Sequence, residues 1–171
     1  LLYMMGLGEV EEGGTKYIRR LPVAQRKAGS LVENVISFIQ THGLTSKLSK
    51  FYGDRDEGDM LFSTALNLSI TWVNRLLFLK LLEGQLLYFH PGDKSYEFFH
   101  TGRNLSASDI TYDDIDDLFF YVLNVPEEKR EKIFTDKFSK VPYLNSSLFE
   151  PTEMEKDIMF IGNLNQNFPL P

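Results

Sequence analysis

The sequence contains no cysteine, a single tryptophan and only three histidines. Without cysteine the chain can form neither disulfides nor thiolate metal sites, which fits a reducing compartment, and we predict a cytoplasmic location. Basic residues are in the minority, with 18 Lys and Arg against 24 Asp and Glu and a formal net charge of −6. This balance argues against a surface built wholly for nucleic acid, although it permits a local basic patch.

What the chain does contain is typical of a globular protein. Hydrophobic residues make up 43% of its 171 residues, and 14 Phe and 8 Tyr are available to fill a core. The length suits a single domain, which we place at residues 15–160, between a flexible lead-in at 1–14 and a tail at 161–171. The first ten residues lack the basic start of a signal peptide. From the residues at its two ends we expect a piece of a longer protein, with the tail leading to the next domain.

The longest helical pattern covers residues 59–87 and is the most apolar part of the chain. Its apolar residues recur at helical spacing and share one broad face. That face holds Leu61, Ala65, Leu68, Trp72, Leu76 and Leu79, and a narrower polar stripe holds Asn67, Thr71, Asn74 and Arg75. We predict a buried central helix with a kink near Gly84, and Arg75 and Lys80 argue against a membrane span. A buried Arg75 needs partners, for which Glu83 or backbone carbonyl groups are the candidates.

Local signals define shorter helices around this one. Ser30 and Glu33 form a capping box, and Gly43 suits a left-handed cap that ends the same helix. Thr111 and Asp114 repeat the capping pattern before another amphipathic helix. Further helices are predicted at residues 47–51, from Pro126 onward and near Thr152 and Glu155, and residues 141–151 indicate an extended or hairpin segment. The predicted fold class is therefore mainly α, an irregular helical bundle around one long buried helix.

Two spacings match metal-dependent sites only in part. Glu97 and His100 have the i, i+3 spacing of carboxylate-bridged di-iron bundles, but no second copy of the pair accompanies them. Asp117 followed by the Glu-Glu-Lys run at 127–129 resembles a nuclease pattern, but Pro126 marks a helix start there and not the strand end that such chemistry needs. We therefore predict no catalytic, cofactor-binding or metal site within this chain.

Five basic residues lie close together near the N-terminus with no acidic residue among them. They are Lys16, Arg19, Arg20, Arg26 and Lys27. Two interpretations remain open, a solvated face of the chain or contact with DNA phosphates. The second interpretation would give an acidic protein a local surface for DNA.

Two stretches carry a family resemblance. Residues 71–87, TWVNRLLFLKLLEGQLL, and 138–151, FSKVPYLNSSLFEP, resemble the helical region just upstream of the catalytic domain in type IIG restriction–modification enzymes and related adenine-specific DNA methyltransferases. The matching positions are Asn74, Arg75, Leu76, Leu77, Phe78, Leu82 and Glu83, then Pro142, Tyr143, Leu144, Asn145, Leu148, Phe149 and Glu150. The family's Gly-Gly pair is replaced by Ser146 and Ser147, where a positive backbone angle is harder to reach.

The resemblance implies a function for a parent enzyme and not an activity of this part of it. Such enzymes use S-adenosylmethionine to methylate the exocyclic amine of adenine, and many also cut DNA with a metal-dependent nuclease that would use Mg²⁺. The motif that grips an extruded base and a Gly-rich cofactor loop are both absent from the sequence. We therefore expect a non-catalytic helical connector whose partners are DNA and the adjacent methyltransferase and nuclease domains, not a membrane. The rival hypotheses are a stand-alone helical protein-interaction module and a complete small enzyme or metalloprotein.

Overall fold

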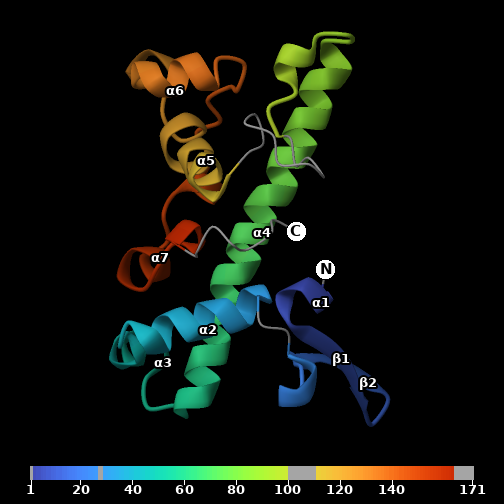
Figure 1. Ribbon diagram of the computed structural model, residues 1–171, viewed down its shortest axis with the longest axis vertical. Helices are drawn as coiled ribbons and strands as arrows, with labels where there is room; N and C mark the ends of the chain where they lie inside the picture. Colours follow the sequence, from blue (N-terminus) through green and yellow to red (C-terminus); the bar gives the residue numbers. More distant parts are fainter. Residues whose placement is uncertain (1, 27–28, 100–110, 164–171) are drawn as a thin grey trace. The chain divides into compact units, whose positions relative to one another are not determined.

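The computed structural model describes residues 2–26, 29–99 and 111–163 (Figure 1). The fold is 61% helical, with one long helix and a two-stranded antiparallel hairpin, so the predicted mainly α class is confirmed. The α-helices are α1 (Leu2–Met5), α2 (Leu31–Thr41), α3 (Ser49–Tyr52), α4 (Glu57–Phe89), α5 (Tyr112–Asp117), α6 (Lys132–Lys137) and α7 (Glu153–Asp157). The strands are β1 (Leu7–Glu12) and β2 (Thr15–Arg20), and the shorter helical turns are η1 (Val23–Gln25), η2 (Thr45–Lys47), η3 (Lys94–Tyr96), η4 (Leu118–Val122), η5 (Glu127–Lys129), η6 (Ser147–Phe149) and η7 (Ile161–Asn163).

The chain divides into two compact units, where the sequence predicts a single domain at residues 15–160. Unit 1 comprises Leu1–Thr71 with Glu153–Pro169, and unit 2 comprises Trp72–Thr152. The division falls inside α4, whose apolar pattern continues across it, and hydrophobic periodicity therefore gives no signal of a boundary. Of the tail predicted at 161–171, the first residues form η7 and the others lie outside the described residues.

The N-terminal segment differs from the flexible lead-in that the sequence predicts at residues 1–14. α1 and β1 occupy most of that stretch, and Met5 and Leu7 anchor it because both side chains are buried in unit 1. Gly13 (φ 59°) and Gly14 (φ 80°) form a two-residue turn between β1 and β2. A turn with positive φ at both positions is the usual connection of a tight hairpin, so the Gly pair that suggests flexibility is in fact a turn signal.

The helix α2 begins at the predicted residue, but its N-terminus is not capped as predicted. Ser30 occupies the N-cap position without a capping hydrogen bond from its side chain, and Glu33 binds Arg20 instead of reaching back. A bond between a carboxylate and a guanidinium is stronger than one to a neutral amide, which explains why the distant partner prevails. At the other end Gly43 adopts φ 65° and closes the helix as a left-handed cap, as predicted.

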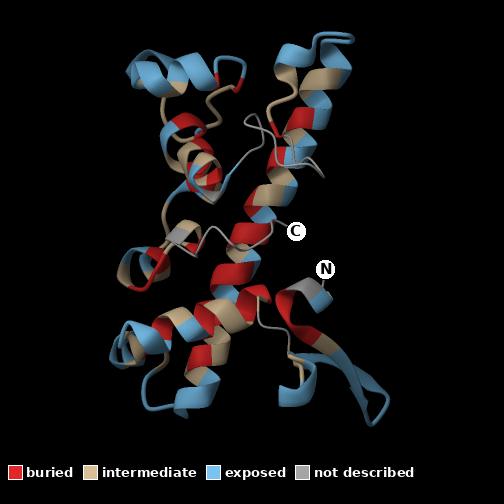
Figure 2. Cartoon of the chain, in the orientation of Figure 1, coloured by how far each residue is buried: buried red, intermediate tan, exposed pale blue. Residues whose placement is uncertain are grey.

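The helix α4 is continuous over 33 residues and extends beyond the predicted span of 59–87 at both ends. It runs through Gly84, where a kink is predicted, because the backbone bonds of a long packed helix outweigh the intrinsic cost of one glycine. Its buried side chains include the predicted Leu61, Ala65, Leu68, Trp72 and Leu79. Exposed residues nevertheless recur along α4 (Figure 2). They include the large apolar residues Ile70, Leu77, Leu81, Tyr88 and Phe89, so α4 is less completely covered than its composition predicts.

By length and composition, α4 is the one helix among the described residues that could cross a membrane. The core helix of a soluble protein passes the same test, and 39% of the most apolar stretch of α4 is buried inside the protein. Its central Arg75 is also buried and hydrogen-bonded within unit 2. Arg75 therefore ties this part of α4 to its own chain, while most of the apolar stretch is not buried.

The helix α5 starts at the capping box that the sequence predicts. Thr111 Oγ1 accepts a hydrogen bond from the Asp114 amide at 3.2 Å, and the Asp114 carboxylate accepts one from the Thr111 amide at 2.9 Å. The helix then widens into the π-helix η4, where the Leu123 amide donates to the Leu118 carbonyl at 2.9 Å. Because a π-turn presents a broader surface, Leu118, Phe119 and Val122 are all buried.

The C-terminal third of the chain follows the predictions in part. Pro126 precedes only the short turn η5, and α6 starts separately because the intervening Arg130 and Glu131 have extended backbone. Residues 141–146 are free of helix, as expected for an extended segment, but the hairpin of this protein is the N-terminal one. The helix α7 forms where Thr152 predicts it.

Each unit has its own apolar core. In unit 1 the buried side chains include Val32, Val35, Ile39, Leu48, Leu61, Ala65 and Leu68. In unit 2 they include Trp72, Leu79, Ile115, Leu118, Phe119, Leu123 and Phe149. Both cores draw on α4, which explains why the most apolar stretch of the sequence is also the longest helix.

Replacing Gly6 with alanine should destabilise the protein more than replacing Gly14. Both residues have positive φ, 82° and 80°, so each alanine introduces backbone strain of about 1 kcal/mol. At Gly6 the new Cβ would also lie 2.5 Å from Ser30 Oγ, whereas nothing lies within 4 Å of a Cβ at Gly14. Urea denaturation should show losses of about 2–3 kcal/mol for Gly6→Ala and about 1 kcal/mol for Gly14→Ala. Equal losses would contradict the close approach of Gly6 to Ser30.

Candidate functional site

The basic residues proposed for DNA contact lie mainly on one strand. Lys16, Arg19 and Arg20 belong to β2, and Arg26 follows η1. Lys27 lies outside the described residues. The strand places Lys16 and Arg20 on one face of the hairpin and Arg19 on the other, so the cations of β2 do not form a single patch.

The cations nearest the hairpin turn are paired with acidic residues of β1. Lys16 Nζ lies 2.5 Å from the Glu9 carboxylate, and an Arg19 guanidinium nitrogen lies 2.8 Å from that of Glu12. The guanidinium carbon of Arg19 also lies over the ring of Tyr17, 5.8 Å from its centroid. The four charged side chains are between 48% and 67% exposed, and each such ion pair contributes at most about 1 kcal/mol. These pairs depend on the register of β1 against β2, which the charge pattern of the sequence does not reveal.

Arg20 and Arg26, the other two described cations of the cluster, converge on Glu33 in the first turn of α2. Arg20 forms a fork with the Glu33 carboxylate, with Nε and a terminal nitrogen 2.6 and 2.7 Å from its two oxygens. Arg26 Nε donates to the carbonyl of Leu21 at 2.8 Å and lies 3.7 Å from Glu33. The hydrogen bond from Arg20 lowers the pKa of Glu33 from its ordinary value, against an opposing effect of partial burial. Arg20 and Arg26 are therefore part of the fold of unit 1.

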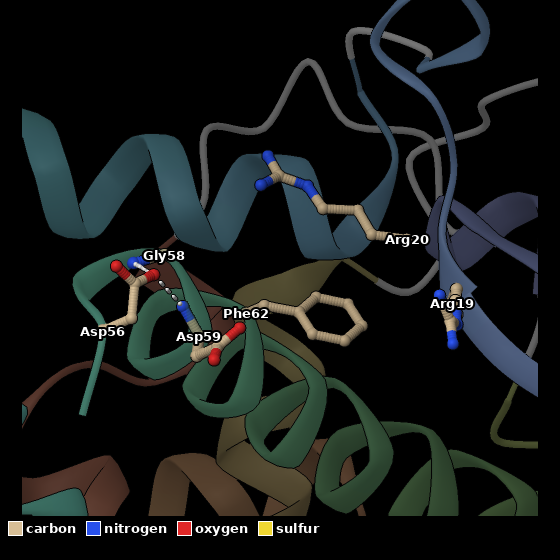
Figure 3. Close-up of a pocket in the computed structure, with 6 residues that line it drawn as sticks. All are labelled: Arg19, Arg20, Asp56, Gly58, Asp59 and Phe62. Carbon is tan, nitrogen blue, oxygen red and sulfur yellow. Dashed lines mark hydrogen bonds between the residues drawn. The ribbon is translucent and has the colours of Figure 1, made fainter.

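An open cleft of about 360 Å³ lies beside Arg19 and Arg20 in unit 1 (Figure 3). Its lining consists of Arg19, Arg20, Asp56, Gly58, Asp59 and Phe62. The Asp56 carboxylate accepts hydrogen bonds from the amides of Gly58 and Asp59, at 2.9 and 3.2 Å, and so caps the start of α4. Because two carboxylates share this cleft with two guanidinium groups, the cleft is poorly suited to a phosphate.

The two stretches that carry the type IIG resemblance, which we call the first and second motif, meet in unit 2, where Arg75 connects them. Its side chain is 1% exposed. Nε donates to the Leu148 carbonyl at 2.7 Å, and a terminal nitrogen donates to the Glu150 carbonyl at 2.9 Å. The guanidinium carbon also lies 5.6 and 5.4 Å from the ring centroids of Phe119 and Phe120. Backbone carbonyls and Glu83 are the partners expected for Arg75, and it binds the carbonyls of Leu148 and Glu150. The Glu83 carboxylate binds Phe99 and Lys80 instead.

The second motif forms a turn that presents those carbonyls. Asn145 adopts φ 45°, the one positive φ among the described non-glycine residues, and asparagine tolerates this region better than most residues. Ser146, where the type IIG enzymes that these stretches resemble have glycine, has φ −116°, and its hydroxyl accepts a hydrogen bond from the Leu148 amide. The substitution at Ser146 is therefore compatible with the turn. Phe149 is fully buried and packs against Phe78, with ring centroids 5.5 Å apart.

Glu83 of the first motif has a separate structural role. Its buried carboxylate accepts a hydrogen bond from the Phe99 amide at 2.6 Å and pairs with Lys80 at 2.8 Å. Lys80 in turn donates to the Phe99 carbonyl at 2.6 Å. Lys80 and Glu83 thus fix the backbone at Phe99, a role that their i, i+3 spacing on a helix gives no means of predicting.

The other motif residues have few polar contacts. Asn74 and Glu150 are exposed, and Glu150 contributes its backbone carbonyl. Pro142, Tyr143 and Leu144 are half-buried, and the Leu144 amide donates to the Leu123 carbonyl at 3.0 Å. These residues shape the extended segment between α6 and η6.

Of the two partial metal patterns, the structure describes only one in full. Glu97 is described, but His100 lies outside the described residues. Asp117 ends α5, whereas the Glu-Glu-Lys run forms η5, a helical turn and not a strand end. Burial raises the pKa of Asp117, with Lys137 opposing that effect. Within the described ranges no group of three or more His, Asp or Glu side chains is placed to hold a metal ion.

Comparison with known proteins identifies one family. Residues 1–171 match the domain of unknown function DUF7814, and the chain belongs to that family. No curated protein and no solved structure matches the chain.

Replacing Arg75 with methionine should destabilise unit 2 strongly. The variant keeps much of the side-chain volume but leaves the Leu148 and Glu150 carbonyls without their charged donors. We expect a loss of about 3 kcal/mol in the free energy of unfolding, since each unsatisfied buried group costs about 1–3 kcal/mol. Arg75→Lys should lose most of the same stability, because a single ammonium group cannot reproduce the two planar guanidinium bonds to the Leu148 and Glu150 carbonyls.

The neighbouring Asn74 gives a matched control, because it lies on the same helix and is exposed. Asn74→Ala should change the free energy of unfolding by no more than about 0.5 kcal/mol in the same urea titration. A loss below about 1 kcal/mol for Arg75→Met would show that Arg75 does not hold the second motif in place.

Proposed function

We propose that this DUF7814 domain is a non-catalytic helical connector of a larger enzyme similar to the type IIG restriction–modification enzymes. The supporting observation is the contact between the two motifs that carry the resemblance, because Arg75 binds the backbone carbonyls of Leu148 and Glu150. The two stretches lie far apart in the sequence. The first supplies the arginine donor, and the second supplies the backbone carbonyl acceptors. Internal bracing of this kind is what a connector requires if it is to hold attached domains in a fixed geometry.

In this proposal the chemistry belongs to the neighbouring domains. A methyltransferase domain of the same chain would bind S-adenosylmethionine and transfer its methyl group to the exocyclic amine of adenine. A nuclease domain, where the enzyme also cuts DNA, would use Mg²⁺. The connector would contribute their relative position in the cytoplasm, without contact with a membrane.

DNA contact by this domain is restricted by the pairing of its cations. Lys16 and Arg19 can exchange their exposed partners for phosphates, because such ion pairs contribute little. Arg20 would have to give up a partly buried fork with Glu33, which costs more. We therefore assign contact with DNA phosphates to Lys16 and Arg19, one on each face of the hairpin, rather than to the whole basic cluster.

A stand-alone interaction module is the second candidate, and one observation favours it. Leu77, Leu81, Tyr88 and Phe89 are all more than half exposed on α4, with Tyr88 at 77%. Exposed apolar side chains in such numbers often mark a surface that another protein covers. A connector would cover this face with a domain of its own chain, whereas an interaction module would cover it with a separate protein.

The native full-length gene product should transfer methyl groups to DNA, while the 171-residue chain alone should not. Incubation of each protein with methyl-labelled S-adenosylmethionine and duplex DNA, followed by counting of the label in adenine, measures this directly. The connector hypothesis requires label in DNA with the full-length protein alone. If the full-length protein transfers no methyl group, the connector hypothesis fails and the interaction module becomes the better explanation.

Neutralising Lys16 and Arg19 in the full-length protein should weaken DNA binding and reduce its dependence on salt. Each lost phosphate contact reduces the magnitude of the negative slope of log K against log salt by about 0.9, so Lys16→Gln with Arg19→Gln should reduce that magnitude by about 2. Lys129→Gln with Lys132→Gln is the matched control, because both lysines are exposed in unit 2. The same slope for both double variants, measured by fluorescence anisotropy, would remove Lys16 and Arg19 from the DNA surface.

A further inference from the structure

The β1–β2 hairpin is exposed to an unusual degree for a sheet. Every residue from 9 to 19 is exposed, on both faces and around the turn (Figure 2). In the part of the chain that the structure describes, the sheet has these two strands alone. A two-stranded sheet is marginally stable in water and gains stability from a third strand, so this hairpin offers two free edges to a partner.

The pairing register identifies the backbone groups that point outward from β2. Glu12 lies opposite Thr15 across the two-residue turn, so this pair exchanges its backbone hydrogen bonds, and so does every second pair after it. The Leu21 amide, which donates to the Gly6 carbonyl at 3.1 Å, follows the same alternation. The amide and carbonyl groups of Lys16 and Ile18 therefore face away from β1. They form the outer edge of β2.

Charge determines which strand this edge can accept. All the charged residues of β2 are basic, and all those of β1 are acidic. A second copy that paired β2 with β2 would set cations against cations, which disfavours that contact. On its inner edge β2 already pairs with an acidic strand, with Lys16 bound to Glu9 and Arg19 bound to Glu12.

We propose that the outer edge of β2 binds an acidic, extended polypeptide segment of another protein, which adds to the hairpin as a third strand. The backbone groups of Lys16 and Ile18 would supply the hydrogen bonds, and the cations of β2 would select acidic residues. Tyr17 and Ile18, 45% and 55% exposed on opposite faces, would cover apolar side chains of the added strand. The proposal is independent of the connector function, because it requires no neighbouring domain and no DNA.

The sequence of β1 with its flanking glycines, GLGEVEEG, is a suitable probe because the structure shows it paired with β2. We would titrate the 171-residue chain into the fluorescein-labelled peptide and follow fluorescence anisotropy at low salt. The control peptide GLGKVKKG has the same length and reversed charge. We expect the acidic peptide to bind at least about tenfold more tightly than the basic one. No binding, or equal binding of the two peptides, would overturn the proposal.

Ile18→Pro tests the edge itself. This variant removes an amide that faces outward, and proline is tolerated on the outer edge of a strand, so the hairpin should persist. Binding of the acidic peptide should fall by about tenfold or more, because proline cannot donate the hydrogen bond. Undiminished binding to Ile18→Pro would show that the peptide displaces β1 or binds elsewhere, and the proposal would then be wrong.

Reversal of charge gives a second test that does not depend on proline being tolerated. Lys16→Glu with Arg19→Glu should exchange the preference, so that the lysine peptide binds more tightly than the glutamate peptide. An unchanged preference would contradict selection by these cations. Concentration-dependent self-association that Ile18→Pro abolishes would identify a second copy as the occupant and would also overturn the assignment to another protein.

Discussion

The buried guanidinium of Arg75 is the interaction on which unit 2 depends. A charged group that is 1% exposed is stable only when its donors find partners, and the carbonyls of Leu148 and Glu150 accept hydrogen bonds from two of its nitrogens. The turn that presents these carbonyls is set by Asn145 and Ser146. Phe149, which lies between Leu148 and Glu150 in the sequence, enters the apolar core. These contacts give the non-helical segment around Asn145 and Ser146 one defined conformation.

Unit 1 satisfies its charges by a different arrangement. Its hairpin places basic β2 beside acidic β1, and the half-buried Arg20 and Glu33 connect the hairpin to α2. The exposed pairs can be exchanged at little cost, whereas the fork between Arg20 and Glu33 is structural. The basic run of the sequence therefore contains exchangeable surface cations, Lys16 and Arg19, and a structural one, Arg20. Only the partners that these residues have in the folded protein distinguish them.

Local signals predicted the parts of this fold that depend on nearby residues. Helical periodicity located α4, and the capping residues Thr111 and Asp114 located the start of α5, because both patterns act within a few residues. The capping box at Ser30 failed because Glu33 has a stronger partner thirteen residues away, Arg20. The hairpin was missed because half of its strand residues are charged and no regular apolar alternation marks the strands, which left Gly13 and Gly14 to suggest flexibility. For Arg75 the sequence predicted the need for partners, but it could not locate carbonyls that are distant along the chain.

The π-turn at Leu118–Val122 has a consequence for how this family can vary in length. A π-turn accommodates one residue more than an α-turn, and a regular α-helix over the same residues would rotate α5 by about 100° relative to Leu123. An aspartate, Asp114 or Asp116, would then take the inward place of Ile115, which is fully buried. The π-turn absorbs the extra residue and keeps Ile115 in the core. A related chain that lacks one residue at this position can therefore form a regular α-turn and keep the same side chains inside.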